Sequence, residues 1–425
     1  MLTSFSIAVP VASPAPTPSR TLERASRWVA LGLIVGSLAA CSFAPPRPPG
    51  ATAPGRPVSV VPAGTPLPVS DGQGGLLRPK ARWNAVDFHA LPGWSNDRHS
   101  EAWPALWRSC QKPNQAWARL CTQVRERGEG WGSSVGDDFV RLWFEQHLQA
   151  WQVRTLDGGT TGLLTGYFEP LLEGRRRADA RFRYPLHRPP ADLGTRKPHL
   201  TRADLEKTAA GRAAIAGREL VYLADPLDVL MIQVQGSGKV RMLDERGTDG
   251  QPRVVRMAFA GHNSQPYQSV ARWLVDQGAV TLDQASWDAI RNWAARNPQR
   301  VSEMMNANPR VVYFREEVPK EADVGPVGAQ GVPLTPQRSI AVDRDAVPLG
   351  TPVWIDTTVP QAWNKREAPQ DLHRLVLAQD TGGAILGGVR ADYFWGAGDE
   401  ALLHAARTKQ SLAMWVLWPR EASPR

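Results

Sequence analysis

The sequence lacks the patterns that mark several common classes of protein. Among its 425 residues are only three cysteines, and its eight histidines nowhere pair with cysteines at the spacing of metal ligands. We therefore predict no metal site. Basic residues form no block, although the net charge is +9 and the isoelectric point is near 9.8. Such a charge suits an acidic polymer or an anionic surface, whereas the scattered cations disfavour a nucleic-acid partner.

The apolar run from Trp28 to Ala40 is too short to span a bilayer comfortably. Three arginines precede it, and it ends in small residues directly before Cys41, a pattern that resembles the bacterial lipoprotein signal. In such signals the cysteine is acylated and becomes the new N-terminus. We therefore predict a signal peptide over residues 1–41 and lipidation of Cys41, with an uncleaved membrane anchor as the alternative. Ser42 stands where an aspartate often signals inner-membrane retention, which implies the outer membrane.

Proline and glycine are abundant, at 37 each, beside 17 tryptophans. That content favours a β-rich, loop-rich architecture over a helical bundle, and the length can hold two domains. Residues 42–82 are rich in proline and almost free of aromatic side chains. We predict that this segment is a disordered tether and that the folded part begins near Trp83.

Two cysteines remain, Cys110 and Cys121. The predicted signal would direct the protein to an oxidising compartment, where an even number of cysteines can pair. They flank a turn at Lys112-Pro113-Asn114 between two helical patterns. A disulfide between them would join the two helices. Two buried free thiols are the alternative.

Apolar periodicity and turn residues predict a mixture of helices and strands. Helices are expected over Arg98–Gln111, Asp137–Trp151, Ser269–Gln277, Trp287–Asn297 and Ser302–Asn306, and from Thr201, where Asp204 would complete a capping box. One apolar face of the second helix would consist of Phe139, Val140, Trp143, Phe144 and Leu148. Strands are expected at Leu163–Pro170, Glu219–Leu223, Val229–Gln235, Val240–Leu243, Val311–Phe314, Arg338–Val342, Pro352–Ile355 and Leu375–Ala378.

The expected strand Val229–Gln235 alternates, so that Gln233 and Gln235 would share one face. Amides both donate and accept hydrogen bonds, which suits neutral sugar hydroxyls. The following Gly236-Ser237-Gly238 is expected to be a hairpin turn, since it lacks the lysine and the helix of a phosphate loop. An exposed strand face without a ligand is the alternative.

Three aspartates stand at the ends of expected strands in the C-terminal quarter. Asp380 ends an apolar run before two glycines, Asp392 precedes three consecutive aromatic residues, and Asp343 ends the strand at Val342. A carboxylate beside aromatic surface loses hydration, which raises its pKa and suits it to carrying a proton. We predict a pocket shared by the three carboxylates; the alternative for Asp380 and Asp392 is that they are turn residues, one capping a helix near Glu400.

Six short motifs together resemble the membrane-bound lytic murein transglycosylase A family with its C-terminal three-aspartate domain. The motifs are Thr165-Gly166-Tyr167-Phe168-Glu169-Pro170, Gln233-Val234-Gln235-Gly236-Ser237-Gly238, Met305-Asn306-Ala307-Asn308-Pro309, Ala341-Val342-Asp343 with Pro348-Leu349-Gly350-Thr351, Asp380-Thr381-Gly382-Gly383-Ala384-Ile385, and Asp392. The resemblance covers residues from about 95 to 418. This sequence departs from the family pattern at Phe168 and at Leu230-Met231. His262 and Ser264 stand where the family usually has a lysine and a glycine.

The resemblance implies a mainly β fold with helices, of the α+β class. A double-psi β-barrel would be built from both ends of the chain, over residues 83–170 and 311–425. A second, barrel-like β domain would be inserted at residues 171–310, with a glycan groove between the two.

The resemblance implies an enzyme, a peptidoglycan lytic exotransglycosylase. It would cleave the β-1,4 bond between N-acetylmuramic acid and N-acetylglucosamine without water and leave 1,6-anhydromuramic acid, with no metal or cofactor. Asp392 matches the single catalytic acid, and Asp380 and then Asp343 are its expected neighbours. One carboxylate suffices because the sugar's C6 hydroxyl replaces the second carboxylate of a hydrolase. A hydrolytic muramidase using Asp392 with Asp380, or a non-catalytic peptidoglycan-binding lipoprotein, are the alternatives.

The expected partners are the glycan strands of peptidoglycan, the outer membrane on its periplasmic face through the lipid anchor, and proteins of cell-wall synthesis or division. Residues expected to bind the glycan are Thr165, Gly166, Tyr167, Gln233, Gln235, Gly236, Ser237, Gly238, Asn263, Gly383 and Ala384.

Overall fold

The computed structural model describes residues 69–422, apart from residues 71, 73, 283, 319–324 and 361–368. The predicted signal peptide, Cys41 and most of the predicted tether therefore lie outside the described residues. Within that part of the chain, no helix is both long enough and apolar enough to traverse a bilayer.

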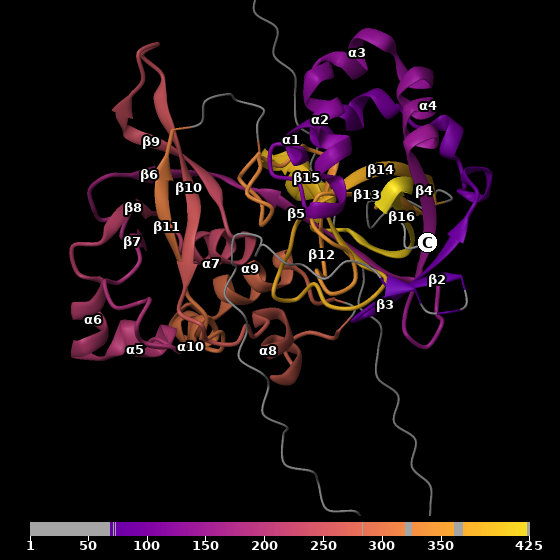
Figure 1. Ribbon diagram of the computed structural model, residues 1–425. Helices are drawn as coiled ribbons and strands as arrows, with labels where there is room; N and C mark the ends of the chain where they lie inside the picture. The colour runs from indigo at the N-terminus through magenta and orange to yellow at the C-terminus, as the bar shows by residue number, and fades with distance from the viewer. Residues whose placement is uncertain are drawn as a thin grey trace, which may run out of the picture. The chain divides into compact units, whose positions relative to one another are not determined.

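The larger sheet is a ring of strands with an arm attached to it (Figure 1). In spatial order its strands are β1 (Val69–Ser70), β2 (Gly75–Arg78), β3 (Ala81–Val86), β4 (Leu148–Arg154), β16 (Lys409–Pro419), β13 (Thr351–Thr358), β14 (Asp371–Asp380), β12 (Ser339–Val342), β15 (Arg390–Ala397) and β5 (Gly162–Glu169). Strand β16 pairs with β4 and β13 and also with β5. The last pairing closes a ring of β5, β16, β13, β14, β12 and β15.

Closure leaves the strands of the ring without free edges, and their residues are accordingly apolar in long runs. Five consecutive residues of β13, from Thr351 to Ile355, are buried, as are the last six residues of β16. Indole rings supply much of the core, with Trp83, Trp354 and Trp418 fully buried. Each such ring removes roughly 200 Å² from water, which is worth about 5 kcal/mol before the entropy of ordering it is subtracted.

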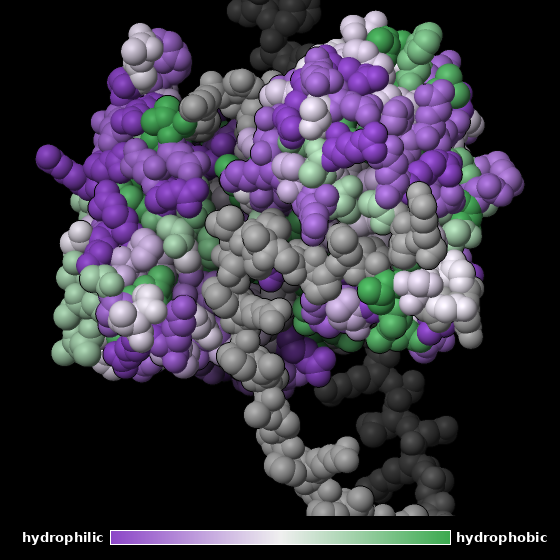
Figure 2. All heavy atoms as spheres, viewed as in Figure 1, coloured by the Kyte–Doolittle hydropathy of each residue, from purple (hydrophilic) through white to green (hydrophobic). Residues whose placement is uncertain are grey.

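The smaller sheet is formed by the middle of the chain. Its order is β11 (Val312–Glu317), β10 (Pro252–His262), β9 (Gly238–Arg246), β6 (Leu171–Arg175), β8 (Glu219–Leu223) and β7 (Tyr184–His187). Hydrophilic side chains cover much of the face over these strands (Figure 2). Only Pro170 separates β5 from β6, so the chain leaves the ring there and returns to it at β12. The expected end of the insert at residue 310 was too early, because β11 pairs with β10 as far as Glu317.

The helices fall into three groups along the chain. Before the ring come α1 (Trp103–Ser109), α2 (Ala118–Arg127), α3 (Trp131–Val135) and α4 (Asp137–His147). The insert carries α5 (Arg202–Lys207), α6 (Ala209–Ile215), α7 (Pro226–Gln235), α8 (Val270–Asp276), α9 (Trp287–Arg296) and α10 (Val301–Asn306). The last helix, α11 (Gly398–Ala405), packs on β5 and β15. This combination of helices with two large sheets confirms the expected mixed class.

Most of the predicted elements are confirmed. The capping box at Thr201 and Asp204 is present at the start of α5. The three helices expected between residues 269 and 306 correspond to α8, α9 and α10, and the strand Glu219–Leu223 is found with the predicted bounds.

Two predictions near the N-terminal end of the fold were wrong. The helix expected over Asp137–Trp151 ends at His147, because β4 begins there and pairs with β3 and β16; Phe139, placed on its apolar face, is 66% exposed. The tether was expected to reach residue 82, yet β2 and β3 form an antiparallel pair, and Leu76 and Ala81 are buried. The apolar pair Leu76-Leu77 beside the Pro79-Lys80 turn was the signal for this hairpin.

The strand expected at Val229–Gln235 is instead helix α7. Asp225 caps it by accepting a hydrogen bond from the Leu227 N–H, at 2.8 Å, and Pro226 occupies its first turn. Gly236 ends it in the left-handed conformation, with φ +81°. The expected hairpin turn at Gly236-Ser237-Gly238 is therefore a helix C-terminus that leads directly into β9.

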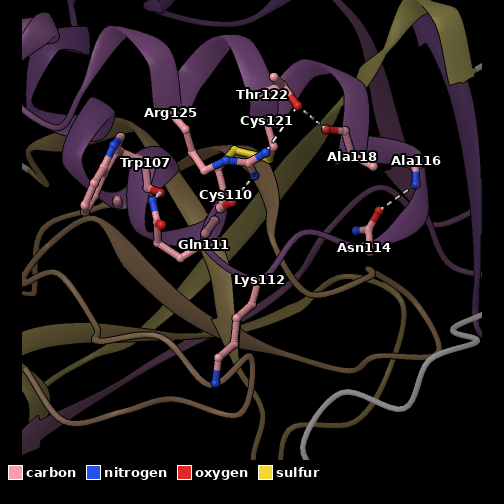
Figure 3. Close-up of a disulfide and its surroundings, with 12 residues drawn as sticks. Trp107, Cys110, Gln111, Lys112, Asn114, Ala116, Ala118, Cys121, Thr122 and Arg125 are labelled. Carbon is pink, nitrogen blue, oxygen red and sulfur yellow. Dashed lines mark hydrogen bonds between the residues drawn. A yellow bond between two sulfur atoms is a disulfide. The ribbon is translucent and has the colours of Figure 1, made fainter.

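The predicted disulfide is confirmed. Cys110 and Cys121 are joined, and the bond ties the end of α1 to α2 across the turn at residues 112–114 (Figure 3). In the same region, the guanidinium of Arg125 on α2 donates to the carbonyl of Cys110, at 2.7 Å. The two short helices thus form one cross-linked unit.

Candidate active site

Two of the three predicted aspartates lie in one row across the ring. Ala341 on β12 pairs with Asp380 on β14 on one side and with Asp392 on β15 on the other. The row continues to Thr165 on β5, which pairs with Asp392. Because neighbouring strands lie about 4.8 Å apart, the two aspartate backbones are separated by roughly 10 Å, and their side chains can approach one common space.

Tyr167 is hydrogen-bonded to one of the two carboxyl groups. Its hydroxyl donates to Oδ2 of Asp380, at 3.1 Å. The pKa of Tyr167 is raised well above its usual value, first by burial and then by the negative charges of Asp380 and Asp392. Tyr167 and Thr165 lie two residues apart on β5 and therefore on the same face of that strand.

Asp392 is a partly buried carboxyl with one strong protein partner. The hydroxyl of Thr165 donates to its Oδ1 at 2.5 Å. Burial raises the pKa of Asp392 to about 6, and the charge of Asp380 adds to the rise, while the Thr165 hydrogen bond and the Arg390 guanidinium oppose it. Asp392 is therefore a carboxyl group that can hold a proton near neutral pH.

Asp380 has more partners than Asp392. Its Oδ1 accepts the backbone N–H groups of Ala329 and Thr381, each at 2.9 Å, and its Oδ2 accepts the Tyr167 hydroxyl. Burial raises the pKa of Asp380, and these three hydrogen bonds oppose that rise. Hydrogen bonds from N–H and O–H groups favour an ionised carboxylate, so the two aspartates are suited to different protonation states.

Asp343 does not join this pair as a free carboxyl. Its Oδ2 accepts Lys80 Nζ at 3.0 Å and the backbone N–H of Gly387 at 2.9 Å, and its Oδ1 accepts the backbone N–H of Asp345. Asp343 is only 4% exposed. These bonds hold the loop before β15 to the arm of the ring, which is a structural role.

The glutamines of α7 connect elements of the protein. Gln235 Oε1 accepts the backbone N–H of Phe168 at 3.2 Å, and Gln233 Oε1 accepts Arg202 Nη2 at 2.7 Å. Both carbonyl oxygens are thus engaged, one with β5 and one with α5. The prediction that the two side chains line one strand face was wrong, since on a helix they cannot share a face at this spacing.

The other predicted glycan contacts fall into buried and exposed sets. Asn263 is fully buried, and its amide donates to the carbonyls of Leu200 and Pro309, so it holds the backbone of the insert together. Ser237 is buried, while Gly383 and Ala384 are exposed in the turn after β14.

Gly166 is required for packing. A Cβ at Gly166 would lie 2.7 Å from both Thr408 Oγ1 and Trp395 Nε1. Gly166 lies on the face of β5 opposite to Thr165 and Tyr167. This face borders an apolar pocket, whose lining includes Phe168, Met231, Val234, Trp287 and Leu402.

Arg390 is a site residue that the sequence analysis missed. Its Nη2 donates to Thr165 Oγ1 at 2.9 Å. It lies two residues before Asp392 on β15, so strand alternation places both on one face, and that spacing was the available signal. Arg390 therefore fixes the direction of the Thr165 hydroxyl, whose hydrogen is left to point at Asp392.

Metal ligation is not suggested by any grouping of side chains among the described residues, since no three His, Cys, Asp or Glu residues gather there. The chemistry that the site offers is proton transfer by one carboxyl beside a second, hydrogen-bonded carboxylate.

Two family models match the chain. The model described as MltA specific insert domain matches residues 163–315, and the model described as 3D domain matches residues 338–418. The first therefore covers β5 and nearly all of the smaller sheet, and the second covers β12 to β16.

The chain is also similar to named proteins and to solved structures. It is 31% identical to the membrane-bound lytic murein transglycosylase A of Vibrio cholerae over 71% of this chain and 76% of that protein. It is 41% identical to the structure of the lytic transglycosylase LtgG of Burkholderia pseudomallei, with a TM-score of 0.53 over 84% of this chain and 100% of the other. For the structure of MltA from Neisseria gonorrhoeae, the identity is 29% and the TM-score 0.67, over 88% and 99%.

Proposed function

The chain belongs to the membrane-bound lytic murein transglycosylase A family, and we propose that it cleaves peptidoglycan glycan strands with Asp392 as the only proton carrier. The bond cleaved is the β-1,4 link from N-acetylmuramic acid to N-acetylglucosamine. No water enters the product, which ends in 1,6-anhydromuramic acid.

Asp392 begins the reaction protonated. Its Oδ1 accepts the Thr165 hydroxyl, and no described protein group bonds its Oδ2, which is therefore the oxygen that carries the proton. As the bond from the muramic C1 to the glycosidic oxygen breaks, Oδ2 gives this proton to the leaving oxygen of N-acetylglucosamine. The pKa of about 6 allows a proton to be held and released near neutral pH.

Asp392 then acts as the base. The C6 hydroxyl of the same muramic acid attacks C1 and gives its proton to Asp392, which restores the starting state. Because the nucleophile belongs to the substrate, its effective concentration is very high, and no second carboxylate is needed to activate water. Asp380 remains ionised, and its charge contributes to the raised pKa of Asp392.

The difference between the two carboxyl groups is the observation that carries this assignment. Burial raises the pKa of both groups, but Asp380 accepts three hydrogen bonds that oppose the rise, whereas Asp392 accepts one and its pKa reaches about 6. We therefore assign the acid–base role to Asp392 and a charge-stabilising role to Asp380.

The test compares Asp392→Asn with the wild type on purified murein sacculi. General acid–base catalysis contributes about 10²–10⁴-fold, and we expect a loss at or above the upper end of that range, since one group serves both steps. Asp371→Asn, an exposed substitution at the start of β14, is the matched control and should keep full activity.

Product analysis by mass spectrometry in ¹⁸O-labelled water completes the test. The wild type should release 1,6-anhydromuramoyl products without label. Label at the cleaved anomeric carbon would make the protein a hydrolytic muramidase, and glycan binding without products would make it a binding lipoprotein. Near-wild-type turnover by a folded Asp392→Asn variant would assign the acid to another residue.

The family also supports proposals on architecture and location. We propose that the ring of six strands is a double-psi barrel, with the smaller sheet as the inserted domain and the glycan held between them. We further propose that Cys41 carries lipid and anchors the protein to the periplasmic face of the outer membrane, where proteins of cell-wall synthesis or division would be its partners.

A further inference from the structure

Arg310 brings a positive charge from the insert to the turn that follows β14, the strand that ends in Asp380. A Cβ at Gly383 would lie only 3.0 Å from Arg310 Nη1. Gly383 is exposed and comes three residues after Asp380. Three residues span at most about 10 Å, so the Cα of Gly383, beside the guanidinium, lies within about one disaccharide length of the Cα of Asp380.

The side chain of Arg310 is fixed in this place. Its Nε donates to the carbonyl of Gln265 at 2.8 Å, and its backbone N–H donates to Asn308 Oδ1 at 3.2 Å. Neither Nη1 nor Nη2 of Arg310 has a hydrogen-bond partner, and no carboxylate pairs with it, among the described residues. Burial lowers its pKa, although the group stays charged.

His262 lies within electrostatic range of Arg310 and of Lys197. The pKa of His262 is lowered to about 4 by burial and then by the positive charges of Arg310 and Lys197. His262 Nδ1 accepts the backbone N–H of Ser264 at 2.9 Å, so the neutral ring carries its hydrogen on Nε2. We refer to Arg310, Lys197 and His262 as the Arg310 cluster.

A partly buried guanidinium without a carboxylate is a site for an anion. Its planar fork matches a carboxylate in geometry, and a charge-assisted pair of this kind is stronger than a neutral hydrogen bond. The sugar backbone of murein is uncharged, and its carboxylates belong to the substituent on muramic acid. They are those of the peptide stem or, where the stem is missing, that of the lactyl group.

We propose that the Arg310 cluster binds a carboxylate of the muramic acid substituent and so positions the glycan strand over Asp392. This inference rests on the proposed function, because it takes murein as the substrate. In this proposal the glycan site contacts the muramic acid substituent as well as the sugar rings.

The experiment compares Arg310→Gln with the wild type on substrates that differ in their carboxylates. Hydrogen bonds to charged groups are worth about 1.5–3 kcal/mol, so we expect the KM on intact sacculi to rise about 10–100-fold, with kcat changed less than two-fold. The Kd for chitohexaose, which has no carboxylate, should change less than two-fold. Arg272→Gln removes an equal charge from an exposed site on α8, where Arg272 pairs with Asp276, and should behave as the wild type.

Sacculi treated with an amidase, which keep only the lactyl carboxylate, distinguish the two sources. If variant and wild type then have equal KM values, the ligand is a carboxylate of the stem; if the difference persists, the site also accepts the lactyl carboxylate that the amidase exposes. An equal loss of affinity for chitohexaose, or an unchanged KM on sacculi, would overturn the proposal.

A measurement on the wild type alone covers the case in which Arg310→Gln does not fold. The KM on sacculi whose carboxylates have been converted to amides should rise by the same 10–100-fold, and an unchanged KM would overturn the proposal. The wild type is first shown to release anhydro products. Their absence would refute the proposed function, a result separate from any effect of Arg310.

Discussion

At the scale of single residues, Thr165 and Arg390 determine how Asp392 can act. The Arg390 guanidinium donates to Thr165 Oγ1, which leaves the hydroxyl hydrogen for Asp392 Oδ1. Both groups favour the ionised carboxylate, whereas burial and the charge of Asp380 favour the protonated one. The pKa of about 6 is the balance of these effects.

Replacing Thr165 with valine should change that balance without changing the volume of the side chain much. The lost hydrogen bond had lowered the pKa of Asp392, so its pKa should rise. For a group that must start protonated, kcat/KM falls as pH rises through the pKa, and the alkaline limb of the profile should move to higher pH. The profile is measured on murein with wild type and Thr165→Val.

Thr122→Val on the exposed face of α2 is the matched control and should leave the profile in place. An alkaline limb that moves to lower pH in Thr165→Val would contradict the assigned direction of the hydrogen bond.

Asp392, the proposed proton carrier, should also lower the stability of the protein at neutral pH. The pKa of Asp392 is about 6 in the folded protein, above the usual 3.8. Such a group contributes stability below the unfolded pKa, and that contribution is lost as pH rises through the folded pKa. Asp392→Asn should therefore be more stable than the wild type at pH 7, by about 1–3 kcal/mol after allowance for its partial exposure.

Urea unfolding at pH 7 and at pH 4 measures this difference, which should shrink at the lower pH. The exposed substitution Asp371→Asn should show no such pH-dependent gain. A loss of stability at pH 7 in Asp392→Asn would mean that burial does not raise the pKa of this carboxyl.

The sequence was sufficient to predict that Asp380 and Asp392 lie near each other, because a glycine turn after an apolar strand and a run of aromatic residues are local signals. It did not reveal that Asp343 is held by Lys80, since that contact joins residues 263 positions apart. The role of Tyr167 as a donor to Asp380 depends on a similar long-range approach. Local patterns therefore identify candidates, and the tertiary fold assigns their partners.

At the scale of elements, α1 supports strand β14, which ends in Asp380. Ser109 near its end donates to Gln330 Oε1 at 3.0 Å and accepts Gln379 Nε2 at 2.8 Å. Gln379 is fully buried and directly precedes Asp380. Cys110 directly follows Ser109. Its disulfide therefore fixes the end of α1 that is hydrogen-bonded to Gln379 on β14.

Removing both cysteines by Cys110→Ala with Cys121→Ala should lower the free energy of unfolding by roughly 2–4 kcal/mol, the usual contribution of a loop of this size. The cysteines are 11 residues apart and both are buried. Urea unfolding of the oxidised wild type and of the double variant measures the effect. The wild type in reducing agent should lose the same amount, and a double variant of unchanged stability would show that packing alone holds the helix.

Helix α7 shows why the sequence misassigned one element. Its residues Leu227, Val229, Leu230, Met231 and Ile232 are all buried, so no polar face reveals a period of 3.6. A short apolar run of this kind is compatible with helix or strand. The signals that decide it are Asp225 and Pro226 at the start and Gly236 at the end, which are typical of a capped helix.

At the scale of the whole molecule, the predicted tether would separate the enzyme from its membrane. The described fold begins at residue 69, so residues 42–68 stand between it and the predicted lipid on Cys41. Fully extended, such a segment reaches roughly 80 Å at about 3 Å per residue.

Cys41→Ala should therefore release the protein from the membrane fraction while its turnover on soluble glycan stays unchanged. Fractionation of washed membranes, followed by an activity assay of both fractions, measures this. The double variant without Cys110 and Cys121 is the control and should remain bound. Retention of Cys41→Ala in washed membranes would contradict the lipoprotein assignment.

The strand that closes the ring is also the last strand of the chain, so we expect the ring to close late in folding. Thr165 and Asp392 lie 227 residues apart in the sequence. One edge of β5 pairs with β15, and the other stays unpaired until β16 has folded against it. Contacts of such high sequence separation form late, because the loop-closure entropy must be overcome first. The smaller sheet is contiguous in sequence and can assemble before them. We therefore expect Asp392 to gain its hydrogen bond from Thr165 only after the strands before and after the insert have come together.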